Sequence, residues 1–257
     1  MVIKVAIAGP RGKMGKETIG TVIKNEQFLL VGLLDNKEVE TSLGDIPIFT
    51  SLKELIKETE PDVLVDLTVP SSVYEHTITA LEHGVRPVIG TTGFSEEQLE
   101  TINHMVEEQG IGCIIAPNFS IGAVLMMKFA QTAAKYLPDV EIIEMHHDQK
   151  LDAPSGTALK TAQMIRQVRN SKTQGSEKEE ELMESARGAE LDGMRIHSVR
   201  LPGLVAHQQV LLGGEGQLLT LKHDSFHRSS YMSGIVLSIE EVMKQNKLIY
   251  GLEEIIL

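Results

Sequence analysis

Between Glu144 and Ala158 the sequence gathers side chains that can hold an anion and move a proton. The stretch reads Glu-Met-His-His-Asp-Gln-Lys-Leu-Asp-Ala-Pro-Ser-Gly-Thr-Ala, so that His146, His147 and Lys150 fall within five positions. The formal net charge of the chain is −12, and an anionic ligand must therefore be held by a local positive cluster and by backbone amides. This segment supplies such a cluster, and we expect it to bind a small anionic substrate.

The same residue types fit the reduction of a conjugated imine. Hydride addition to a C=C–C=N system needs a proton donor for the partner atom, and a histidine or lysine near carboxylates can serve. His146 and Lys150 are the candidate acids, whereas His147 fits better as a substrate ligand. Ser155-Gly156-Thr157 is predicted to open a helix capped by Asp152 or Ser155, where free amides and a hydroxyl can hold a carboxylate.

A glycine-rich turn near the start of the chain is typical of a dinucleotide site. Gly9, Gly12 and Gly15 follow an apolar run over residues 2–8 and precede a predicted helix over 13–25. Glycines in this position let the backbone approach a pyrophosphate, and the helix then offers its first amides to the negative charge.

Asp35 bears on the choice between the two nicotinamide cofactors. It ends the predicted strand 28–34, where a carboxylate accepts hydrogen bonds from the adenosine ribose and repels a 2′-phosphate. Arg11 and Lys13 in the turn, and Lys37 two residues on, can offset that repulsion. We therefore expect NADH to be weakly preferred and NADPH to be accepted.

The elements that would position these residues alternate between strand and helix as far as residue 117. Strands are predicted over 62–67, 87–89 and 111–116, and helices over 74–83 and from the cap Ser95 to 109. Alternation of this kind favours a doubly wound parallel sheet. Gly90-Thr91-Thr92-Gly93 follows one of these strands, and is either a wall for the nicotinamide ribose or an ordinary turn.

The pattern changes after Pro117-Asn118. Helices are predicted over 121–136, 157–170 and 229–245, and strands over 140–145, 195–200, 208–212 and 218–222. The polar segment 171–193 is expected to be a solvated loop or a short helix. The last three of these strands are closely spaced and have glycine turns nearby. They predict an antiparallel or mixed sheet, and hence a second, α+β domain. The last helix is expected to pack back on the first domain.

Composition excludes several classes of protein. No apolar run approaches the roughly 20 residues that span a bilayer, and no basic stripe suits a nucleic acid. The lone Cys113 allows no internal disulfide, and the short apolar opening lacks a secretory leader, so we expect a cytoplasmic protein. No metal is expected, because adjacent histidines on a strand point to opposite faces and no Cys/His set accompanies them.

Taken together, these motifs resemble those of the dihydrodipicolinate reductase (4-hydroxy-tetrahydrodipicolinate reductase) family of lysine and diaminopimelate biosynthesis. The likeness covers essentially the whole chain, and its most specific part is His-His-x-x-Lys-x-Asp-Ala-Pro-Ser-Gly-Thr from His146 to Thr157. Further parts are the turn 9–15, Ile89 to Phe94, Ala116-Pro117-Asn118-Phe119-Ser120, Arg200, Pro202-Gly203, His207 and residues 223–228.

The resemblance implies an N-terminal Rossmann-like domain of residues 1–117 and 229–257 and a C-terminal α+β domain of residues 118–228. The second would bind the substrate and form a homotetramer through its sheet. His146 would be the catalytic donor or acceptor and Lys150 the proton donor. His147, Lys150, Gly156 and Thr157, with Ser155 beside them, would hold two carboxylates. Cofactor contacts would come from Gly9, Gly12, Lys13, Met14, Gly15, Asp35, Gly90, Thr91, Thr92, Asn118, Phe119 and Arg228.

Two departures and two alternative functions remain. Asp148 and Gln149 stand where many members carry a further basic residue, and Pro10-Arg11 stands where a glycine-rich pair is common.

A sugar or amino-acid dehydrogenase on the same scaffold is one alternative function, against which the Lys150 to Thr157 run argues. A non-catalytic dinucleotide sensor is the other, against which the intact His146 and Lys150 argue.

Overall fold

The computed structural model describes residues 2–37, 42–176 and 178–256, and these form two compact units. The first unit comprises residues 1–121 and 231–257, and the second comprises residues 122–230. The division therefore falls four residues after the expected boundary at 117 and two residues after the expected boundary at 228. Residues 1, 38–41, 177 and 257, which fall inside the predicted domains, lie outside the described residues.

The first unit is built on a parallel sheet with one antiparallel edge strand. Its described strands run in the order β13-β7-β6-β5-β1-β2-β4-β3, and only β3 is antiparallel to its neighbour. Their bounds are β1 Ile3–Ala8, β2 Phe28–Leu34, β3 Ser42–Leu43, β4 Ile46–Phe49, β5 Val63–Asp66, β6 Arg86–Ile89, β7 Cys113–Ile115 and β13 Leu248–Tyr250. This is the predicted Rossmann-like sheet, and the prediction is confirmed.

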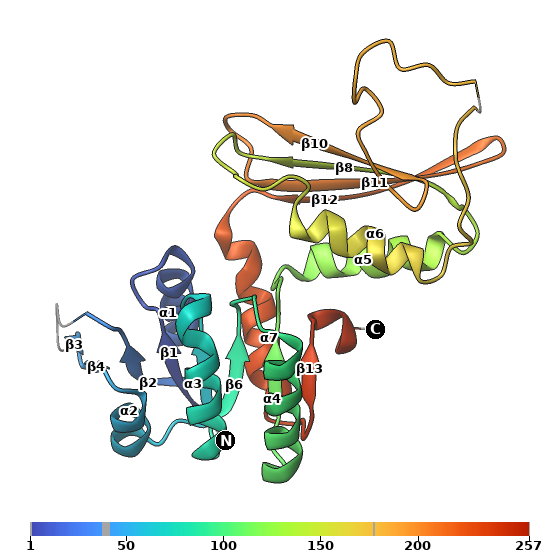
Figure 1. Cartoon of the computed structure of the whole chain (residues 1–257). Coiled ribbons are helices and arrows are strands. Elements are labelled where there is room, and N and C mark those ends of the chain that lie inside the picture. The colour runs from blue at the N-terminus through green and yellow to red at the C-terminus, as the bar shows by residue number, and fades with distance from the viewer. Residues whose placement is uncertain (1, 38–41, 177, 257) are drawn as a thin grey trace. The chain divides into compact units, whose positions relative to one another are not determined.

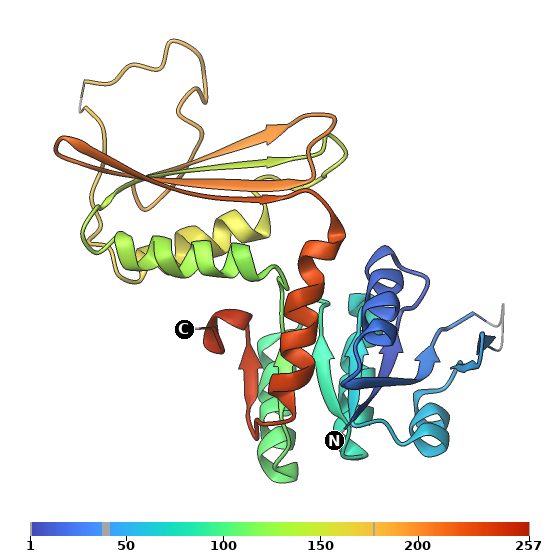
Figure 2. The same ribbon diagram turned by 180° about the vertical axis from the view of Figure 1, so that it is seen from behind.

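Helices cover both faces of this sheet, as a doubly wound fold requires. Figure 1 shows α3 (Pro70–Glu82) and α4 (Glu96–Gln109) on the near face, and Figure 2 shows α1 (Lys13–Lys24) and α7 (Met232–Val242) on the other. Because both faces are covered, the central strands are apolar on both sides, and residues 5–8 of β1 are fully buried. The helix near the C-terminus does belong to this unit.

Several elements differ from their predicted bounds. Helix α3 begins at Pro70 rather than Tyr74, because proline suits the first turn, where an amide would lack a partner. The helix expected over 229–245 is a 3₁₀ turn, η1 (Arg228–Tyr231), followed by α7. Helix α2 (Leu52–Thr59) and strands β3, β4 and β13 were not predicted, and a 3₁₀ turn, η2 (Leu252–Glu254), follows β13.

The second unit is a mixed sheet with helices on one face. Its strand order is β12-β11-β8-β10-β9, in which β8 is parallel to β10 and antiparallel to β11. The bounds are β8 Asp139–His146, β9 Ala189–Leu191, β10 Met194–Arg200, β11 Ala206–Gly214 and β12 Gln217–Ser225. Helices α5 (Ile121–Ala133) and α6 (Gly156–Arg166) pack on the same face (Figure 1). The predicted α+β character is confirmed.

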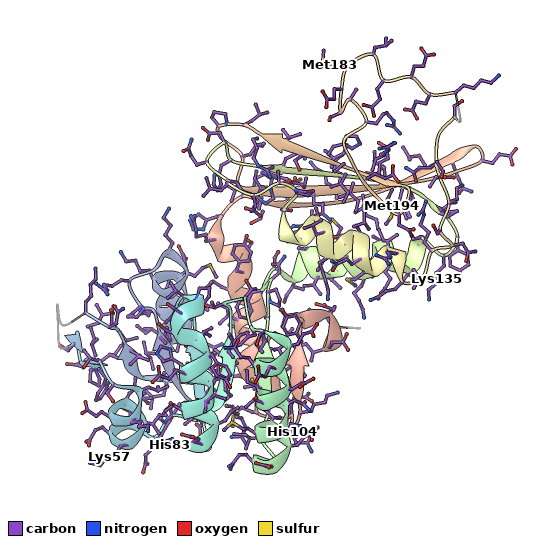
Figure 3. The ribbon with its side chains drawn as sticks, in the orientation of Figure 1. Lys57, His83, His104, Lys135, Met183 and Met194 are labelled. Atoms are coloured by element: carbon purple, nitrogen blue, oxygen red, sulfur yellow. The ribbon has the colours of Figure 1, made fainter. Side chains whose placement is uncertain are left out.

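Burial alternates along β8 because one face of the sheet packs on the helices and the other does not. Val140, Ile142 and Glu144 are fully buried, whereas the residues between them are half-buried. Met194 packs in this core, whereas Met183 lies on the segment before β9 with 76% of its surface exposed (Figure 3). The segment 171–193 was predicted as a loop or a short helix, and β9 is the regular element missed in it. No helix among the described residues is long and apolar enough to span a bilayer.

Candidate active site

The glycine turn of the first unit leaves no room for side chains. Gly9 has a φ of 84°, and a Cβ there would lie 2.9 Å from the carbonyl oxygen of Leu67. A Cβ on Gly15 would lie 2.1 Å from the carbonyl oxygen of Gly9, so the turn packs directly on the first turn of α1. Gly12 caps α1 without a side chain, which leaves the first amides of the helix open to an anion.

Asp35 is held by the turn itself. Nε and Nη2 of Arg11 donate hydrogen bonds to the two carboxylate oxygens of Asp35, and the amide of Lys37 donates to Oδ1 at 3.1 Å. The Asp35 side chain is 8% exposed and that of Arg11 is 47% exposed. Arg11 therefore neutralises the carboxylate that was expected to accept the ribose hydroxyls.

A cleft of about 410 Å³ joins the turn to Asp35. It is lined by Gly9, Arg11, Gly12, Leu34, Asp35, Asn36, Lys37, Thr50, Leu67, Thr68, Val69, Ser72 and His76. A neighbouring cavity of about 350 Å³ shares Arg11, Asp35 and Lys37 with the cleft but is otherwise mainly apolar. The cleft has the glycine turn, the helix amides and the carboxylate that a dinucleotide needs, so its residues fit an adenosine pyrophosphate.

His76 on one wall of this cleft is fixed by a buried carboxylate. Its Nδ1 lies 2.7 Å from Oδ2 of Asp66, which is 1% exposed at the end of β5. The amide and hydroxyl of Thr68 donate to the other oxygen, Oδ1, at 2.8 and 2.5 Å. Neither His76 nor Asp66 was predicted as a site residue; the only signal in the sequence was a buried strand that ends in an acid.

The remaining predicted cofactor residues of this unit lie after β6 and β7. The hydroxyl of Thr91 donates to the carbonyl oxygen of Thr68 at 2.9 Å, which ties the 90–93 turn to the cleft wall. Phe119 is 4% exposed, and the amide of Ser120 donates to Oδ1 of Asn118 at 2.8 Å. Lys13 and Met14 open α1, while Arg228 is exposed at the start of η1 in the second unit.

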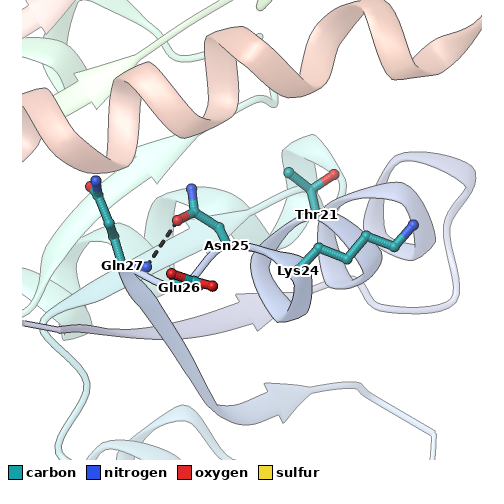
Figure 4. Close-up of a pocket in the computed structure, with 5 residues that line it drawn as sticks. All are labelled: Thr21, Lys24, Asn25, Glu26 and Gln27. Atoms are coloured by element: carbon teal, nitrogen blue, oxygen red, sulfur yellow. Dashed lines mark hydrogen bonds between the residues drawn. The ribbon is translucent and has the colours of Figure 1, made fainter.

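A separate hollow in the first unit is not a candidate site. It is lined by Thr21, Lys24, Asn25, Glu26 and Gln27, at the end of α1 and the start of β2 (Figure 4). The amide of Gln27 donates to Oδ1 of Asn25 at 2.9 Å across it. Because α1 begins at the glycine turn, this hollow lies at the opposite end of that helix, by the amino ends of the strands. Ligands of open α/β sheets bind at the carboxyl ends.

In the second unit, His146 ends strand β8 and is held by a buried glutamate. Its Nδ1 lies 2.5 Å from Oε2 of Glu144, which is 0% exposed. Arg200 donates from Nη1 to Oε2 at 2.9 Å and from Nη2 to Oε1 at 2.8 Å. Burial opposes the ionisation of Glu144, but the hydrogen bonds from His146, Arg200 and Ser198 outweigh it and lower its pKa to about 2.

Glu144 also reaches the segment that was predicted to hold carboxylates. The amide of Ser155 donates to Oε1 of Glu144 at 3.2 Å, and Nη2 of Arg200 donates to the carbonyl oxygen of Asp152 at 2.8 Å. Ser155 is the N-cap of α6, and its hydroxyl accepts from the amide of Ala158 at 3.3 Å. Of the two predicted caps, Ser155 is therefore right and Asp152 is not. Gly156 and Thr157 form the first turn of α6.

Lys150 and His147 flank this arrangement. Nζ of Lys150 donates to Oδ1 of Asp152 at 2.7 Å, and this bond lowers the pKa of Asp152. The side chain of Lys150 is 20% exposed, and that of Asp152 is 63% exposed. His147 is exposed just after the end of β8. The structure thus gathers the predicted His146, Lys150 and Ser155 around one loop.

Glu144 and Arg200 belong to this cluster although neither was predicted to have a role in it. Glu144 and His146 are two residues apart on a strand, and such side chains share a face; this was the available signal for Glu144. Arg200 was quoted only as part of the family likeness, and it reaches the cluster because β10 pairs with β8 in a register that sets Arg200 beside His146. Among the described residues no three His, Cys, Asp or Glu side chains gather into a possible metal site.

Comparison with known proteins decides the family. Residues 3–119 match the family description "Dihydrodipicolinate reductase, N-terminus", and residues 122–256 match "Dihydrodipicolinate reductase, C-terminus". The chain belongs to the dihydrodipicolinate reductase family. The 4-hydroxy-tetrahydrodipicolinate reductase of Lysinibacillus sphaericus is 63% identical over the whole of both chains. That of Bacillus subtilis is 56% identical over 99% of this chain and 98% of its own.

Solved structures agree with this assignment to the dihydrodipicolinate reductase family. The dipicolinate-bound dihydrodipicolinate reductase from Paenisporosarcina sp. TG-14 matches with a TM-score of 0.94 and 58% identity over all of both chains. GenD2 from gentamicin A biosynthesis, solved with NAD, matches with a TM-score of 0.66 but only 15% identity, over 95% of this chain and 87% of its own. That second likeness shows the shared fold alone.

Proposed function

We propose that the two ligand sets described above carry the activity of the dihydrodipicolinate reductase family. The enzyme reduces 4-hydroxy-tetrahydrodipicolinate with NAD(P)H in lysine and diaminopimelate biosynthesis. One NAD(P)H, one proton and the hydroxylated substrate give NAD(P)⁺, tetrahydrodipicolinate and water. The observation that carries the assignment is the cluster of His146, Lys150 and the α6 cap in a chain so similar to enzymes of that name.

The cofactor belongs to the Gly9–Gly15 turn and the cleft beside it. Gly9, Gly12, Lys13, Met14 and Gly15 would hold the pyrophosphate, and Asp35 the adenosine ribose. Gly90, Thr91, Thr92, Asn118 and Phe119 would line the nicotinamide half, with Arg228 as a further contact. When bound, the nicotinamide supplies the hydride.

Both NADH and NADPH would be used, with a weak preference for NADH. Asp35 would accept hydrogen bonds from a free ribose diol, which favours NADH. The two hydrogen bonds from Arg11 neutralise that carboxylate, and the repulsion of a 2′-phosphate falls accordingly. Arg11 and Lys37 would then be the cations that accept the phosphate of NADPH.

The substrate is a small dianion, and its two carboxylates fit the start of α6. Ser155 caps the helix, and Gly156 and Thr157 form its first turn, where the positive end of the helix dipole favours an anion. Lys150 and His147 bring positive charge to a chain whose net charge is −12. A substrate carboxylate would replace Asp152 as the partner of Lys150.

Proton delivery falls to His146 and Lys150. Because Nδ1 of His146 faces a carboxylate that only accepts hydrogen bonds, that nitrogen carries a proton and Nε2 is left for exchange with the substrate. Lys150 Nζ can donate a proton once a substrate carboxylate has displaced Asp152. Loss of the 4-hydroxyl group as water gives the substrate a conjugated C=C–C=N system. The hydride would then add to one end of this system, and the proton to the other.

Four copies of the chain would assemble through the sheet of the second unit. No helix among the described residues of that unit packs on the face opposite α5 and α6, and Ile143, Met145 and Leu211 on it are only half-buried. Leu218 of the edge strand β12, which pairs with Gly213 on the same face, is 66% exposed. Such an apolar sheet face is typical of a homo-oligomer interface, and sedimentation of the pure protein would reveal a tetramer.

A coupled assay tests the enzymatic proposal. Pyruvate, aspartate semialdehyde and the synthase that joins them would generate the unstable substrate in place, while the absorbance of NADH or NADPH is followed. Oxidation that requires this chain and is lost in Lys150→Ala supports the proposal. Binding of NADH without oxidation of either cofactor would instead favour a dinucleotide sensor.

A further inference from the structure

We propose that Glu144 is a positioning residue that fixes the proton on Nδ1 of His146 and, through the same carboxylate, holds the loop that binds the substrate. The inference rests on the proposed function and extends it to a residue that touches neither ligand. Its basis is a set of contacts made by one fully buried side chain.

Glu144 fixes the orientation of the His146 imidazole. Nδ1 of His146 lies 2.5 Å from Oε2 of Glu144, and the histidine side chain is 16% exposed. An ionised carboxylate can only accept a hydrogen bond, so Nδ1 must be the donor. The ring is therefore locked in one orientation with Nε2 as the exchanging atom, whether His146 is charged or neutral.

Arg200 balances the negative charge of Glu144. Both oxygens of Glu144 accept hydrogen bonds from Arg200, so that the buried carboxylate and the guanidinium cancel each other. A lone carboxylate at 0% exposure would tend to take up a proton and lose its role as an acceptor. Arg200 thus keeps Glu144 ionised and able to hold His146.

Glu144 and Arg200 also link the proton donor His146 to the loop that would bind the substrate. Oε1 of Glu144 accepts the amide of Ser155, and Arg200 donates to the carbonyl oxygen of Asp152. These contacts span the loop that carries Lys150 at one end and the α6 cap at the other. One side chain consequently sets the spacing between the imidazole and the carboxylate-binding amides.

The chain offers a matched control on the same strand. Glu141 is also paired with an arginine and a histidine: Nη2 of Arg187 lies 2.7 Å from Oε1, and Nε2 of His197 lies 3.0 Å from Oε2. Being three residues from Glu144, it points to the opposite face of the sheet. Its variant Glu141→Gln removes the same charge from the same kind of cluster, away from the proposed chemistry.

The experiment compares Glu144→Gln with Glu141→Gln in the coupled assay, after melting curves and sedimentation confirm folded proteins of equal size. An amide can donate to Nδ1 and so permit the wrong tautomer, and we expect kcat of Glu144→Gln to fall by about 10²–10⁴. KM for the cofactor should stay unchanged, and Glu141→Gln should keep its rate within about twofold. A folded Glu144→Gln protein with the parent kcat would overturn the proposal.

A spectroscopic measurement separates positioning from general damage. In the unaltered protein labelled with ¹⁵N-histidine, the His146 signals are found by their loss in His146→Gln, and Nδ1 should be protonated throughout the neutral and mildly alkaline range. In Glu144→Gln, part of the His146 population should move to the tautomer protonated on Nε2. An unprotonated Nδ1 of His146 in the parent protein would contradict the proposal. This measurement needs no variant of Glu144.

Two further outcomes are distinguishable. If Glu144→Gln does not fold because Arg200 is left unpaired, the variant Glu144→Gln/Arg200→Met removes both charges and should show the same loss of kcat. A double variant with the parent kcat would contradict the inference. If the parent protein itself oxidises neither cofactor, the proposed function fails, whereas the tautomer of His146 still decides the role of Glu144.

Discussion

Arg11 donates two hydrogen bonds to the carboxylate of Asp35, so the turn that would hold the pyrophosphate also neutralises the residue that would read the ribose. The pair joins a residue of the turn to the end of β2, 24 positions away. An acid at the end of the second strand normally discriminates against a 2′-phosphate. If this cleft binds the cofactor as proposed, Arg11 would weaken that discrimination from within the same site.

The first prediction concerns Asp35. Asp35→Ala removes the acceptor for the ribose hydroxyls and leaves Arg11 without its partner, so KM for NADH should rise by about tenfold, the value of one or two hydrogen bonds, and KM for NADPH should rise less. Initial rates at saturating substrate measure both constants. An equal loss for both cofactors would mean that the ribose is read elsewhere.

The second prediction is the opposite change at Arg11. Arg11→Ala exposes the full charge of Asp35 to a 2′-phosphate, and KM for NADPH should rise by roughly ten- to a hundredfold while KM for NADH changes little. Lys24→Ala removes a positive charge from the opposite end of α1, away from the glycine turn, and serves as the control. A rise in KM for NADH alone would contradict the role given to Arg11.

The third prediction concerns the two proton donors. His146→Ala and Lys150→Ala should each lower kcat by about 10²–10⁴, because each removes a group that moves a proton. Neither residue belongs to the unit that carries the glycine turn, so the dissociation constant of NADH, measured by fluorescence titration, should be unaltered. Near-normal turnover in either variant would remove that residue from the mechanism.

The fourth prediction is competition by pyridine-2,6-dicarboxylate. This planar dianion presents two carboxylates to Lys150 and to the cap of α6, and it should raise KM for the substrate without lowering the maximal rate. Its inhibition constant should weaken in Lys150→Ala, because the variant removes one carboxylate partner. Indifference of the enzyme to millimolar inhibitor would undermine the carboxylate site.

The fifth prediction is a loss of stability in acid that depends on Glu144. Its pKa in the folded protein is about 2, below the ordinary value of 4.5, so ionisation of this group stabilises the folded state above pH 4.5. That contribution, roughly 3 kcal/mol from the difference between 4.5 and about 2, is lost as the pH falls from 4.5 towards 2. Urea unfolding between pH 7 and pH 3 should show a shallower loss in Glu144→Gln/Arg200→Met than in the parent protein.

The first unit shows most clearly which features can be predicted from the sequence and which cannot. Gly9, Gly12 and Gly15 stand between an apolar strand and a helix, and local sterics alone require that turn. Asp35 as the end of the next strand follows from the same pattern. The partner of Asp35 does not, because Arg11 reaches it only once β1 and β2 lie side by side in parallel.

The second unit divides in the same way. The types and order of His146, Lys150 and Ser155 are local facts, and they predicted the proton donors and the cap of α6. Glu144 stands in the same stretch, yet its importance depends on Arg200, 56 residues further on, and on the burial of the Glu144 carboxylate. Hydrogen-bond partners set by strand register and burial set by packing are properties of the fold, and no local pattern encodes them.

The sequence by itself therefore determined the strand–helix order, the turn and the residue types of both ligand sets, since these follow from backbone sterics and periodicity. The tertiary structure alone decided which charges meet: Arg11 with Asp35, Asp66 with His76, and Glu144 with both His146 and Arg200. The physical reason is that long-range pairing depends on how separate strands are ordered and registered, and the energy of a buried charge depends on the neighbours that this ordering supplies.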